Sequence, residues 1–254
     1  MISNSQKKIL LTGATGNLGV ALGTFLKKKY FVHQPLRKTL DITNQRQVNA
    51  WVQSHSFDSV VHTAALARMK TCEENPSLAI ETNVIGTANL VYAILQKEKE
   101  TQKEIRFIHI STDGVYDGQK GNFSERCETL PYNVYGWSKL GSECAVRALK
   151  NHCIIRGSFF DPQNLIFPTA ATDVFSSRIP LDEFVKAIEF LIENTVCGVL
   201  NVGGERKSDY ERYLMYKKEI RPCTQEDILK DSGVPMAKDA SLNCSKWQKL
   251  RGEF

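Results

Sequence analysis

The feature that most constrains this chain is a regular alternation of strand-like and helix-like segments over its first 156 residues. Short apolar runs predict buried strands at residues 8–11, 31–36, 59–62, 105–110 and 152–156. Helical periodicity predicts helices from the first glycine-rich turn to about residue 28 and over residues 44–54, 75–97 and 133–149. Strands separated by helices of this length form right-handed crossovers in a parallel sheet covered on both faces. The predicted fold class is therefore α/β, with a doubly wound, parallel Rossmann-type sheet.

Two of these helices carry apolar stripes that predict which side faces the core. In residues 75–97, a spacing of three to four positions gives the stripe Ile80, Val84, Ala88, Val91 and Leu95. In residues 133–149, the predicted buried face consists of Val134, Trp137, Gly141 and Ala145. This orientation leaves Tyr135 and Lys139 facing the cleft.

The pattern loosens after Arg156, where residues 157–179 are rich in Phe, Pro and Ser and lack a sustained period. A helix over residues 181–192 and a strand over residues 199–202 follow, and then short polar helical pieces. We divide the chain into a Rossmann domain, residues 1–156, and a small C-terminal lobe, residues 157–254, interleaved with the sheet edge. The lobe is predicted to fold over the carboxyl edge of the sheet, where open α/β sheets bind ligands.

Composition excludes several classes of protein. Hydrophobic residues make up 42% and charged residues 24%, as in folded globular chains. No apolar run approaches the roughly 20 residues that span a bilayer, and the polar start lacks a signal peptide, so we expect a cytoplasmic protein without a membrane partner. The net charge of +5 is mild, and no basic patch interleaved with aromatics predicts a nucleic-acid partner. The seven cysteines lack zinc-ligand spacing, so we expect reduced, mostly buried thiols and no metal.

A glycine-rich turn, Gly13-Ala14-Thr15-Gly16-Asn17-Leu18-Gly19, lies between the first strand and the first helix. Gly13 permits the tight turn, Gly16 lets backbone amides approach a pyrophosphate, and Gly19 lets the helix pack closely. The helix N-terminus adds unpaired N–H groups and a partial positive charge. We therefore predict a dinucleotide site with these contacts: Gly13, Thr15, Gly16, Asn17, Leu18 and Gly19.

The end of the second strand predicts which dinucleotide binds. An acidic residue there would bind the ribose 2′-hydroxyl of NAD. This chain instead has Arg37 and Lys38 and no carboxylate, which favours the 2′-phosphate of NADP(H). Both cations also fit an exposed loop, so NAD(H) stays open.

Two further motifs predict proton-transfer chemistry. Tyr135 and Lys139 lie four residues apart, on one face of a predicted helix. The ammonium is expected to lower the pKa of the phenol, so that Tyr135 acts as the acid or base partner of a hydride transfer. Thr112 follows the strand at residues 105–110, which places its hydroxyl at the same sheet edge, where it can bind the substrate oxygen.

These motifs together resemble a known family. The glycine turn, Val61-His62-Thr63-Ala64-Ala65, Asn83-Val84-Ile85-Gly86-Thr87, Ser111-Thr112-Asp113 and Tyr135-x-x-x-Lys139 are typical of extended short-chain dehydrogenases. Within them, the phrases at residues 111–118, 135–143 and 239–247 resemble the dTDP-4-dehydrorhamnose reductase group. The resemblance is dense to Arg156 and sparse beyond it.

The resemblance implies roles for individual residues. The implied catalytic set is Thr112, Tyr135 and Lys139. The implied cofactor contacts beyond the glycine turn are Arg37, Asp41, Ile42, Ala64, Ala65, Tyr135 and Lys139, with Asn83 supporting the framework. The implied substrate contacts are Asp113, Tyr116, Trp137 and Arg156. Gly114 and Gly157 depart from the family, which usually has a tyrosine and a threonine there, and the lobe is short.

The leading hypothesis is NADPH-dependent reduction of the 4-keto group of a nucleotide-linked 6-deoxysugar, dTDP- or UDP-4-dehydrorhamnose-like, in nucleotide-sugar biosynthesis. One alternative is a 4-epimerase or dehydratase that retains NAD. An alternative of another class is a non-catalytic NADP-binding regulatory subunit, like the beta subunit of methionine adenosyltransferase, which resembles the same reductases. The complete set of Thr112, Tyr135 and Lys139 argues for retained chemistry. A nucleotide-sugar substrate is the expected partner, and assembly as a homodimer is left open.

Overall fold

The protein is built around a six-stranded parallel sheet. A computed structural model describes residues 6–252. The strand order is β10-β5-β4-β3-β1-β2, and every pairing is parallel. The strands are β1 (Lys8–Thr12), β2 (Phe31–His33), β3 (Ser59–His62), β4 (Arg106–Ile110), β5 (His152–Arg156) and β10 (Gly198–Asn201). The order reverses direction at β1, next to β3, which is the switch point where doubly wound sheets bind ligands.

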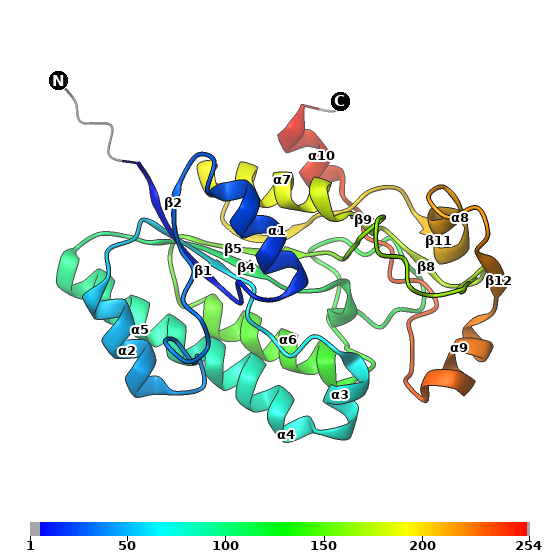
Figure 1. Ribbon diagram of the computed structural model, residues 1–254, viewed down its shortest axis with the longest axis horizontal. Coiled ribbons are helices and arrows are strands. Elements are labelled where there is room, and N and C mark those ends of the chain that lie inside the picture. The colour runs from blue at the N-terminus through cyan, green and yellow to red at the C-terminus, as the bar shows by residue number, and fades with distance from the viewer. Residues whose placement is uncertain (1–5, 253–254) are drawn as a thin grey trace.

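Helices cover both faces of the sheet (Figure 1). One face carries α1 (Asn17–Leu26), α7 (Leu181–Glu193) and α10 (Ser245–Arg251). The other carries α2 (Gln45–Ser54), α5 (Gly86–Thr101) and α6 (Val134–Val146). The alternation of side chains along each strand divides the core accordingly, because Ile9 and Leu11 face α1 while Leu10 faces α2. This confirms the predicted fold class.

The predicted strands are largely confirmed, but the longest predicted helix is wrong in detail. Residues 69–101 form α3 (Met69–Glu74), α4 (Pro76–Ala79), a π-helical turn η1 (Ile80–Ile85) and α5. A π turn holds one extra residue, which rotates the following helix relative to a regular α-helix. Ile80 is consequently half exposed, whereas Asn83 and Thr87 are buried. The apolar stripe predicted from regular 3.6-residue spacing therefore begins at Ile80, which lies on the exposed side of the helix instead of the buried side.

The stretch Pro76–Thr101 is long and apolar enough, by length and composition alone, to cross a membrane. The sequence had not predicted a run of that kind. In the structure this stretch contacts α2 and α6, and Leu90 and Ile94 are fully buried in the core. Part of its apolar surface is therefore used inside the domain, while Ile80, Ile85 and Tyr92 are about half exposed.

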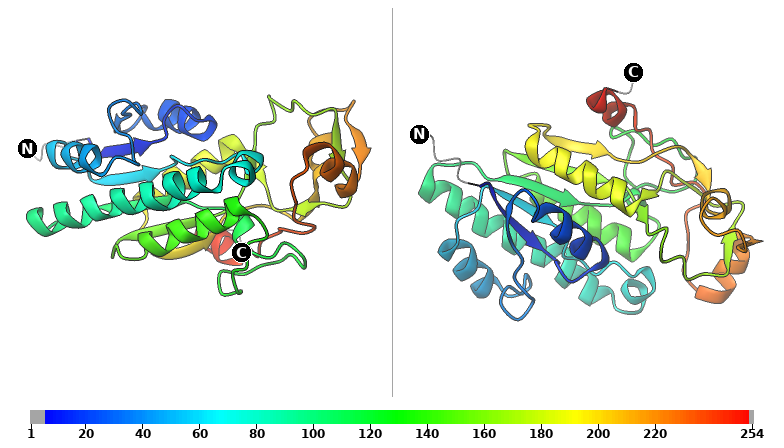
Figure 2. Two further views of the ribbon diagram at one scale, coloured as in Figure 1. Left: turned by 90° about the horizontal axis from the view of Figure 1, so that it is seen from below. Right: turned by 45° about the horizontal axis from the view of Figure 1, so that its top comes forward.

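The region after Arg156 contributes to both the sheet and a smaller lobe (Figure 2). Its helix α7 and strand β10 complete the sheet layer, so the predicted boundary at Arg156 crosses a continuous core. The lobe holds three short strand pairs: β6 (Phe159–Phe160) with β9 (Ile179–Pro180), β7 (Thr169–Ala171) with β12 (Arg221–Cys223), and β8 (Phe175–Ser176) with β11 (Lys207–Ser208). Two helices accompany them, α8 (Asp209–Leu214) and α9 (Gln225–Ser232).

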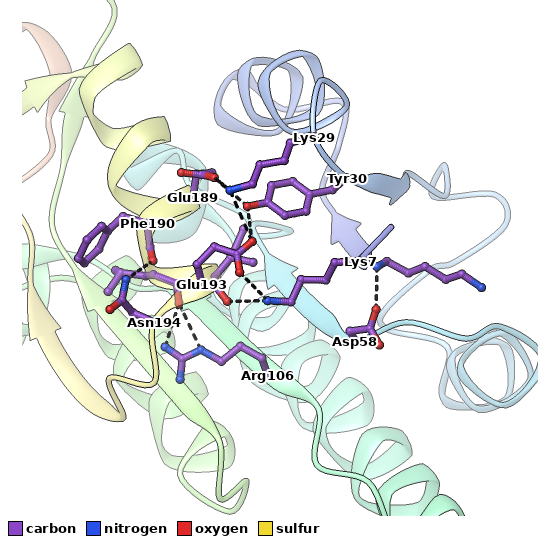
Figure 3. Close-up of polar contacts among 12 residues, drawn as sticks. Lys7, Lys29, Tyr30, Asp58, Arg106, Glu189, Phe190, Glu193 and Asn194 are labelled. Atoms are coloured by element: carbon purple, nitrogen blue, oxygen red, sulfur yellow. Dashed lines mark hydrogen bonds and ion pairs between the residues drawn. The ribbon is translucent and has the colours of Figure 1, made fainter. Parts of the chain in front are cut away.

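A polar network fastens α7 to the amino edge of the sheet (Figure 3). The Tyr30 hydroxyl oxygen lies 2.7 Å from Glu189 Oε1 and 2.6 Å from Glu193 Oε1, so the two carboxylates share its one proton. Lys7 Nζ reaches Glu193 at 3.1 Å, and the buried guanidinium of Arg106 donates to the carbonyl of Leu191. These contacts bind the last turns of α7 at the end of the sheet opposite the ligand edge.

The thiols are free, but the prediction that most are buried is wrong. The buried ones are Cys72, Cys153 and Cys244, while Cys127, Cys144 and Cys197 are exposed.

Candidate active site

The glycine-rich turn closes tightly over the carboxyl end of β1. Gly13 has φ +70°, and a Cβ on it would lie 2.5 Å from the backbone nitrogen of Ala64. A Cβ on Gly19 would overlap the carbonyl oxygen of Gly13. No side chain caps the N-terminus of α1, where Gly16 is the N-cap. The first amides of α1 are thus available to an anion, and both glycine roles predicted for Gly13 and Gly19 hold.

The first cavity, of about 240 Å³, lies between the glycine turn and the ends of β2 and β3. It brings together eight of the predicted cofactor contacts: Gly13, Thr15, Gly16, Arg37, Asp41, Ile42, Ala64 and Ala65. Sequence reasoning missed several further lining residues: Thr12, Ala14, Pro35, Leu40, Thr43, Thr63 and Thr82. Thr82 differs from the others because it is not next to a predicted cofactor motif in the sequence. It reaches the cavity from the π-helical turn η1.

Arg37 and Asp41 form an ion pair at the rim of this cavity. Arg37 Nε lies 3.0 Å from Asp41 Oδ2, and the arginine side chain is 76% exposed. Partial burial raises the pKa of Asp41, but hydrogen bonds from Thr43 and Arg37 hold that pKa below its usual value. A carboxylate therefore holds the guanidinium at Nε, and most of the arginine side chain stays exposed. Lys38 is exposed and does not line the cavity.

A second cavity, of about 440 Å³, continues from the first along the carboxyl edge. The two share Gly13, Gly16, Thr63 and Ala65 in their linings. The second cavity adds the remaining predicted cofactor contacts Asn17, Leu18 and Gly19, together with Thr112, Tyr135 and Lys139. The structure thus places the three predicted catalytic side chains in one groove with the glycine turn.

Thr112 and Tyr135 lie together in this groove. Thr112 is the N-cap of a 3₁₀ turn, η2 (Asp113–Val115), and its Oγ1 accepts from Gly114 N at 3.1 Å. Burial and the nearby carboxylate of Asp113 raise the pKa of Tyr135, while a hydrogen bond with Thr112 lowers it. The predicted lowering of the Tyr135 pKa is therefore wrong for this state. The cost of removing the phenolate from water outweighs the hydrogen bond with Thr112, which favours the ionised form.

Lys139 is buried in the floor of the groove. Burial lowers the pKa of Lys139 to about 8, and the charge of Glu143 opposes that shift. Beneath it, the rings of His62 and His109 stack with centroids 5.4 Å apart. Burial and the charge of Lys139 lower the pKa of His62 to about 3, so both imidazoles are neutral at physiological pH.

Hydrogen bonds link this pair to the neighbouring elements. His62 bridges Thr12 Oγ1 at 2.7 Å and Thr87 Oγ1 at 2.9 Å. His109 contacts Ser142 Oγ at 2.8 Å, and Ser142 donates to the carbonyl of Lys139 at 2.6 Å. The glycine turn, α5 and α6 are therefore held in fixed relation.

Asn83 supports the framework, as the sequence predicted. From the π-helical turn, its amide donates to Leu66 O at 3.0 Å and to Ser138 Oγ at 2.8 Å. Its Oδ1 accepts from Leu66 N at 2.7 Å. These bonds join the loop after β3 to α6, next to Tyr135 and Lys139.

Three predicted substrate contacts lie outside the groove. Tyr116 is fully buried and packs its ring 4.7 Å from that of Phe123, and its hydroxyl accepts from Arg156 at 2.9 Å. Arg156 is paired with Glu143 at 2.7 Å, both side chains being at most 3% exposed. Trp137, on α6, is 52% exposed and lines none of the cavities along the carboxyl edge. These three assignments are corrected, because two side chains belong to the interior and one to the surface.

The burial of α6 also differs from the prediction. Gly136, Lys139, Ser142 and Val146 are buried, rather than a face that includes Trp137. The helix packs by its small and polar side chains against η1 and α5. Apolar spacing alone therefore selected the wrong face.

A third, small cavity opens from the same site toward the lobe. It is about 40 Å³ and is lined by Met69, Thr112, Asp113, Gly114, Tyr132, Tyr135, Val174, Phe175, Ser176, Arg178, Met236, Ala237 and Ala240. Of these, only Asp113 was a predicted substrate contact. Thr112 and Tyr135 were predicted as catalytic residues. The lobe contributes Val174, Phe175, Ser176, Arg178, Met236, Ala237 and Ala240 through segments without sequence periodicity, so the positions of these seven had no local signal.

Gly157, one of the two departures from the reductase pattern, has a steric reason. A Cβ on Gly157 would overlap the carbonyl oxygen of Val202, just beyond β10. A threonine could not occupy this position without displacing that segment. Gly157 also lines the second cavity, so the close packing of β5 against β10 shapes its wall.

Comparisons with known proteins agree with this geometry. The family described as RmlD substrate binding domain matches residues 7–165. The probable low-salt glycan biosynthesis reductase Agl14 of Haloferax volcanii is 33% identical over 193 residues, which cover 67% of this chain and 62% of that protein. The methionine adenosyltransferase 2 subunit beta of Xenopus laevis is 30% identical, covering 96% of this chain and 83% of that protein.

The likeness in structure extends over nearly the whole chain. The dTDP-4-dehydrorhamnose reductase of Bacillus anthracis, in complex with NADP, superposes with a TM-score of 0.85 at 24% identity. That match covers 97% of this chain and 93% of the other. Three curated relatives match over 62%, 53% and 46% of their own lengths, so the chain spans about half to three-fifths of them.

Proposed function

The chain belongs to the RmlD substrate-binding-domain family, and from this premise we propose that it is an NADPH-dependent reductase acting on the 4-keto group of a nucleotide-linked 6-deoxysugar. One observation carries the proposal. Thr112, Tyr135 and Lys139 line the same cavity as the glycine turn at the N-terminus of α1. A hydride carrier bound at that turn and a carbonyl held by the two hydroxyls would meet in this cavity.

The residues present fit a dinucleotide. Gly13 takes a positive φ that other residues rarely adopt, and the uncapped start of α1 offers amides to a pyrophosphate. Asp41, Ile42, Ala64 and Ala65 would hold the adenosine half, and Tyr135 and Lys139 the nicotinamide half. When bound, the reduced nicotinamide supplies the hydride.

The chain's own side chains supply the proton and hold the ketone. With the sugar bound, the Thr112 hydroxyl would turn its proton from Asp113 Oδ1 to the ketone oxygen, which fixes the carbonyl beside Tyr135. The Tyr135 hydroxyl would donate its proton to that oxygen as the hydride reaches the carbon, so the ketone becomes an alcohol. The Lys139 ammonium would favour the resulting phenolate, and Asp113 would contact the sugar hydroxyls.

The lobe, made of the three short strand pairs with α8 and α9, is proposed to close over the nucleotide sugar. Its segments line the third cavity opposite Thr112 and Tyr135. We place the reaction in the cytoplasm, in nucleotide-sugar biosynthesis, with a homodimer as the assembly to be tested by sedimentation. Nucleic acid and membrane have no part in this proposal.

The test is the fate of the hydride. With a panel of dTDP- and UDP-linked 4-keto-6-deoxysugars, we expect one NADPH to be oxidised per sugar converted. The loss of absorbance at the reduced-nicotinamide band measures this oxidation. No conversion should occur without added reduced cofactor. Conversion of a nucleotide hexose without net oxidation would replace the proposal with an epimerase or dehydratase that retains NAD.

A regulatory role is the second candidate, and one observation favours it. The Xenopus subunit beta covers 96% of this chain, more than the Haloferax reductase does. Tight NADPH binding with no turnover on any nucleotide sugar would select this role. The intact grouping of Thr112, Tyr135 and Lys139 favours the reductase.

A second prediction concerns cofactor preference. Arg37→Ala should weaken NADPH binding by about 10- to 100-fold and NADH binding much less, because a charge-assisted hydrogen bond to the 2′-phosphate is lost. Titration of each cofactor by fluorescence measures both affinities. Lys38→Ala, in the exposed neighbour that does not line the cavity, is the matched control. Equal losses for both cofactors would show that Arg37 does not read the phosphate.

A further inference from the structure

We propose that Arg178 is the site at which the lobe binds the diphosphate of the nucleotide sugar. This inference rests on the proposed substrate class and names how the chain recognises it. Arg178 precedes β9 and lines both the second and the third cavity, together with Thr112, Asp113 and Tyr135. It is therefore the lobe side chain that touches both parts of the groove beside the proposed proton donor.

Arg178 supplies positive charge on the lobe side of the groove. In the part of the chain that the structure describes, Lys139 and Arg178 are the two cations lining these two cavities. Lys139 is 3% exposed in the floor beside Tyr135, so its ammonium is confined to the reaction centre. A diphosphate carries at least two negative charges, and Arg178 is the remaining cation available to it.

The lobe holds the guanidinium in place from one side. Its Nη1 donates to the hydroxyl of Tyr213 at 2.9 Å and lies 3.6 Å from Asp209 Oδ2, both residues belonging to α8. The charges of Asp209 and Tyr213 raise the pKa of Arg178, so the side chain stays ionised. Arg212, also on α8, donates to the carbonyls of Ser176 and Arg178 and so fixes the backbone.

The lobe contacts leave part of the Arg178 side chain exposed to the two cavities. Arg178 Nε is buried and has no hydrogen-bond partner, although the side chain as a whole is 26% exposed. A buried donor without a partner is costly, and a phosphate oxygen is the acceptor that a guanidinium fits best. The unpaired donor and the remaining exposure together indicate an anion site.

Asp113 is the carboxylate whose negative charge would repel an anion bound at Arg178. Its Oδ2 accepts from Ser158 Oγ at 2.5 Å and its Oδ1 from Thr112 Oγ1 at 3.1 Å. Both oxygens are therefore already engaged, and Arg178 faces their charge. The alternative role for Arg178 is to neutralise Asp113 without touching substrate, and the two roles predict different measurements.

The experiment compares nucleoside diphosphates with nucleosides. Binding of dTDP, UDP, thymidine and uridine is measured by calorimetry on the full chain with NADPH present. Arg178→Met should weaken dTDP or UDP by about 10- to 100-fold and leave the nucleosides unchanged. Arg178→Lys should recover part of that loss, since it restores the charge without the planar fork.

Arg206→Met is the matched control. Arg206 is also an ion-paired lobe arginine, 2.7 Å from Asp239 and 50% exposed, but it lines neither cavity. It should keep wild-type affinity for dTDP. Because Arg178→Met leaves Asp209 buried without its cation, NADPH affinity and thermal unfolding are measured for every variant. Arg178→Met combined with Asp209→Asn tests the site again if the single variant unfolds.

The outcomes separate this inference from the proposed function. Unchanged dTDP affinity in folded Arg178→Met, with a shifted pH profile of turnover, would assign Arg178 to Asp113 and overturn the inference while the reductase stands. Binding of dTDP that depends on Arg178, without turnover on any sugar, would support the diphosphate site and reject the reductase. Equal weakening of dTDP and thymidine would also overturn the inference.

Discussion

Replacing Tyr135 with phenylalanine is expected to lower turnover by about 100-fold or more while leaving the fold and NADPH binding intact. The substitution removes the hydroxyl that is hydrogen-bonded with Thr112 and keeps the ring that packs in the groove. Without the phenol, the groove loses the hydroxyl that is hydrogen-bonded with Thr112 and that is proposed to donate the proton. Stopped-flow absorbance measures turnover, and cofactor fluorescence measures binding.

The control removes a phenolic hydroxyl elsewhere. Tyr30→Phe eliminates the hydrogen bonds to Glu189 and Glu193 at the amino edge of the sheet, at the opposite end of the strands from the groove (Figure 3). It should lower thermal stability and leave turnover near the wild-type value. Near-normal turnover in Tyr135→Phe would remove Tyr135 from the mechanism and favour the regulatory role.

Much of the fold follows from the sequence because its strands are short, apolar and bounded by polar residues. The strands at residues 59–62 and 152–156 coincide with β3 and β5. The helix expected from residue 44 begins there because Asn44 caps α2 by accepting from Gln47 N. The π-helical turn at Ile80–Ile85 had no such signal. Its extra residue serves Asn83, whose partners Leu66 and Ser138 lie far away in the sequence.

The site residues also divide into those that local sequence motifs predict and those that depend on distant segments. The predicted cofactor contacts follow the ends of β1, β2 and β3, so local motifs were sufficient to select residues that line one continuous groove. Arg178 was missed because nothing around it is periodic, and its partners on α8 come from a separate segment. Tyr116 and Arg156 were misassigned because a polar side chain at the carboxyl edge gives the same sequence signal whether it faces a ligand or an interior partner.

Arg156→Met is the prediction that separates those two roles for an arginine. The Arg156–Glu143 pair is buried, with side-chain exposures of 3% and 1%. Removing one partner of a buried ion pair leaves an uncompensated charge and typically costs about 3–5 kcal/mol. We therefore expect Arg156→Met to lower the free energy of unfolding by about that amount, measured by urea denaturation. The KM for the nucleotide sugar should be unchanged in the folded fraction.

A second substitution in the same pair completes the test. Glu143→Gln in the Arg156→Met background removes the stranded charge and keeps an acceptor for the Ser111 hydroxyl, which lies 2.6 Å from Glu143. The double variant should recover a large part of the lost stability, because the penalty comes from the unpaired carboxylate and not from the missing guanidinium alone. If Arg156 instead bound the substrate, Arg156→Met would raise KM with little change in unfolding, and Glu143→Gln would restore nothing. Ser111 directly precedes Thr112, so the pair would act on the reaction by holding the end of β4 in place.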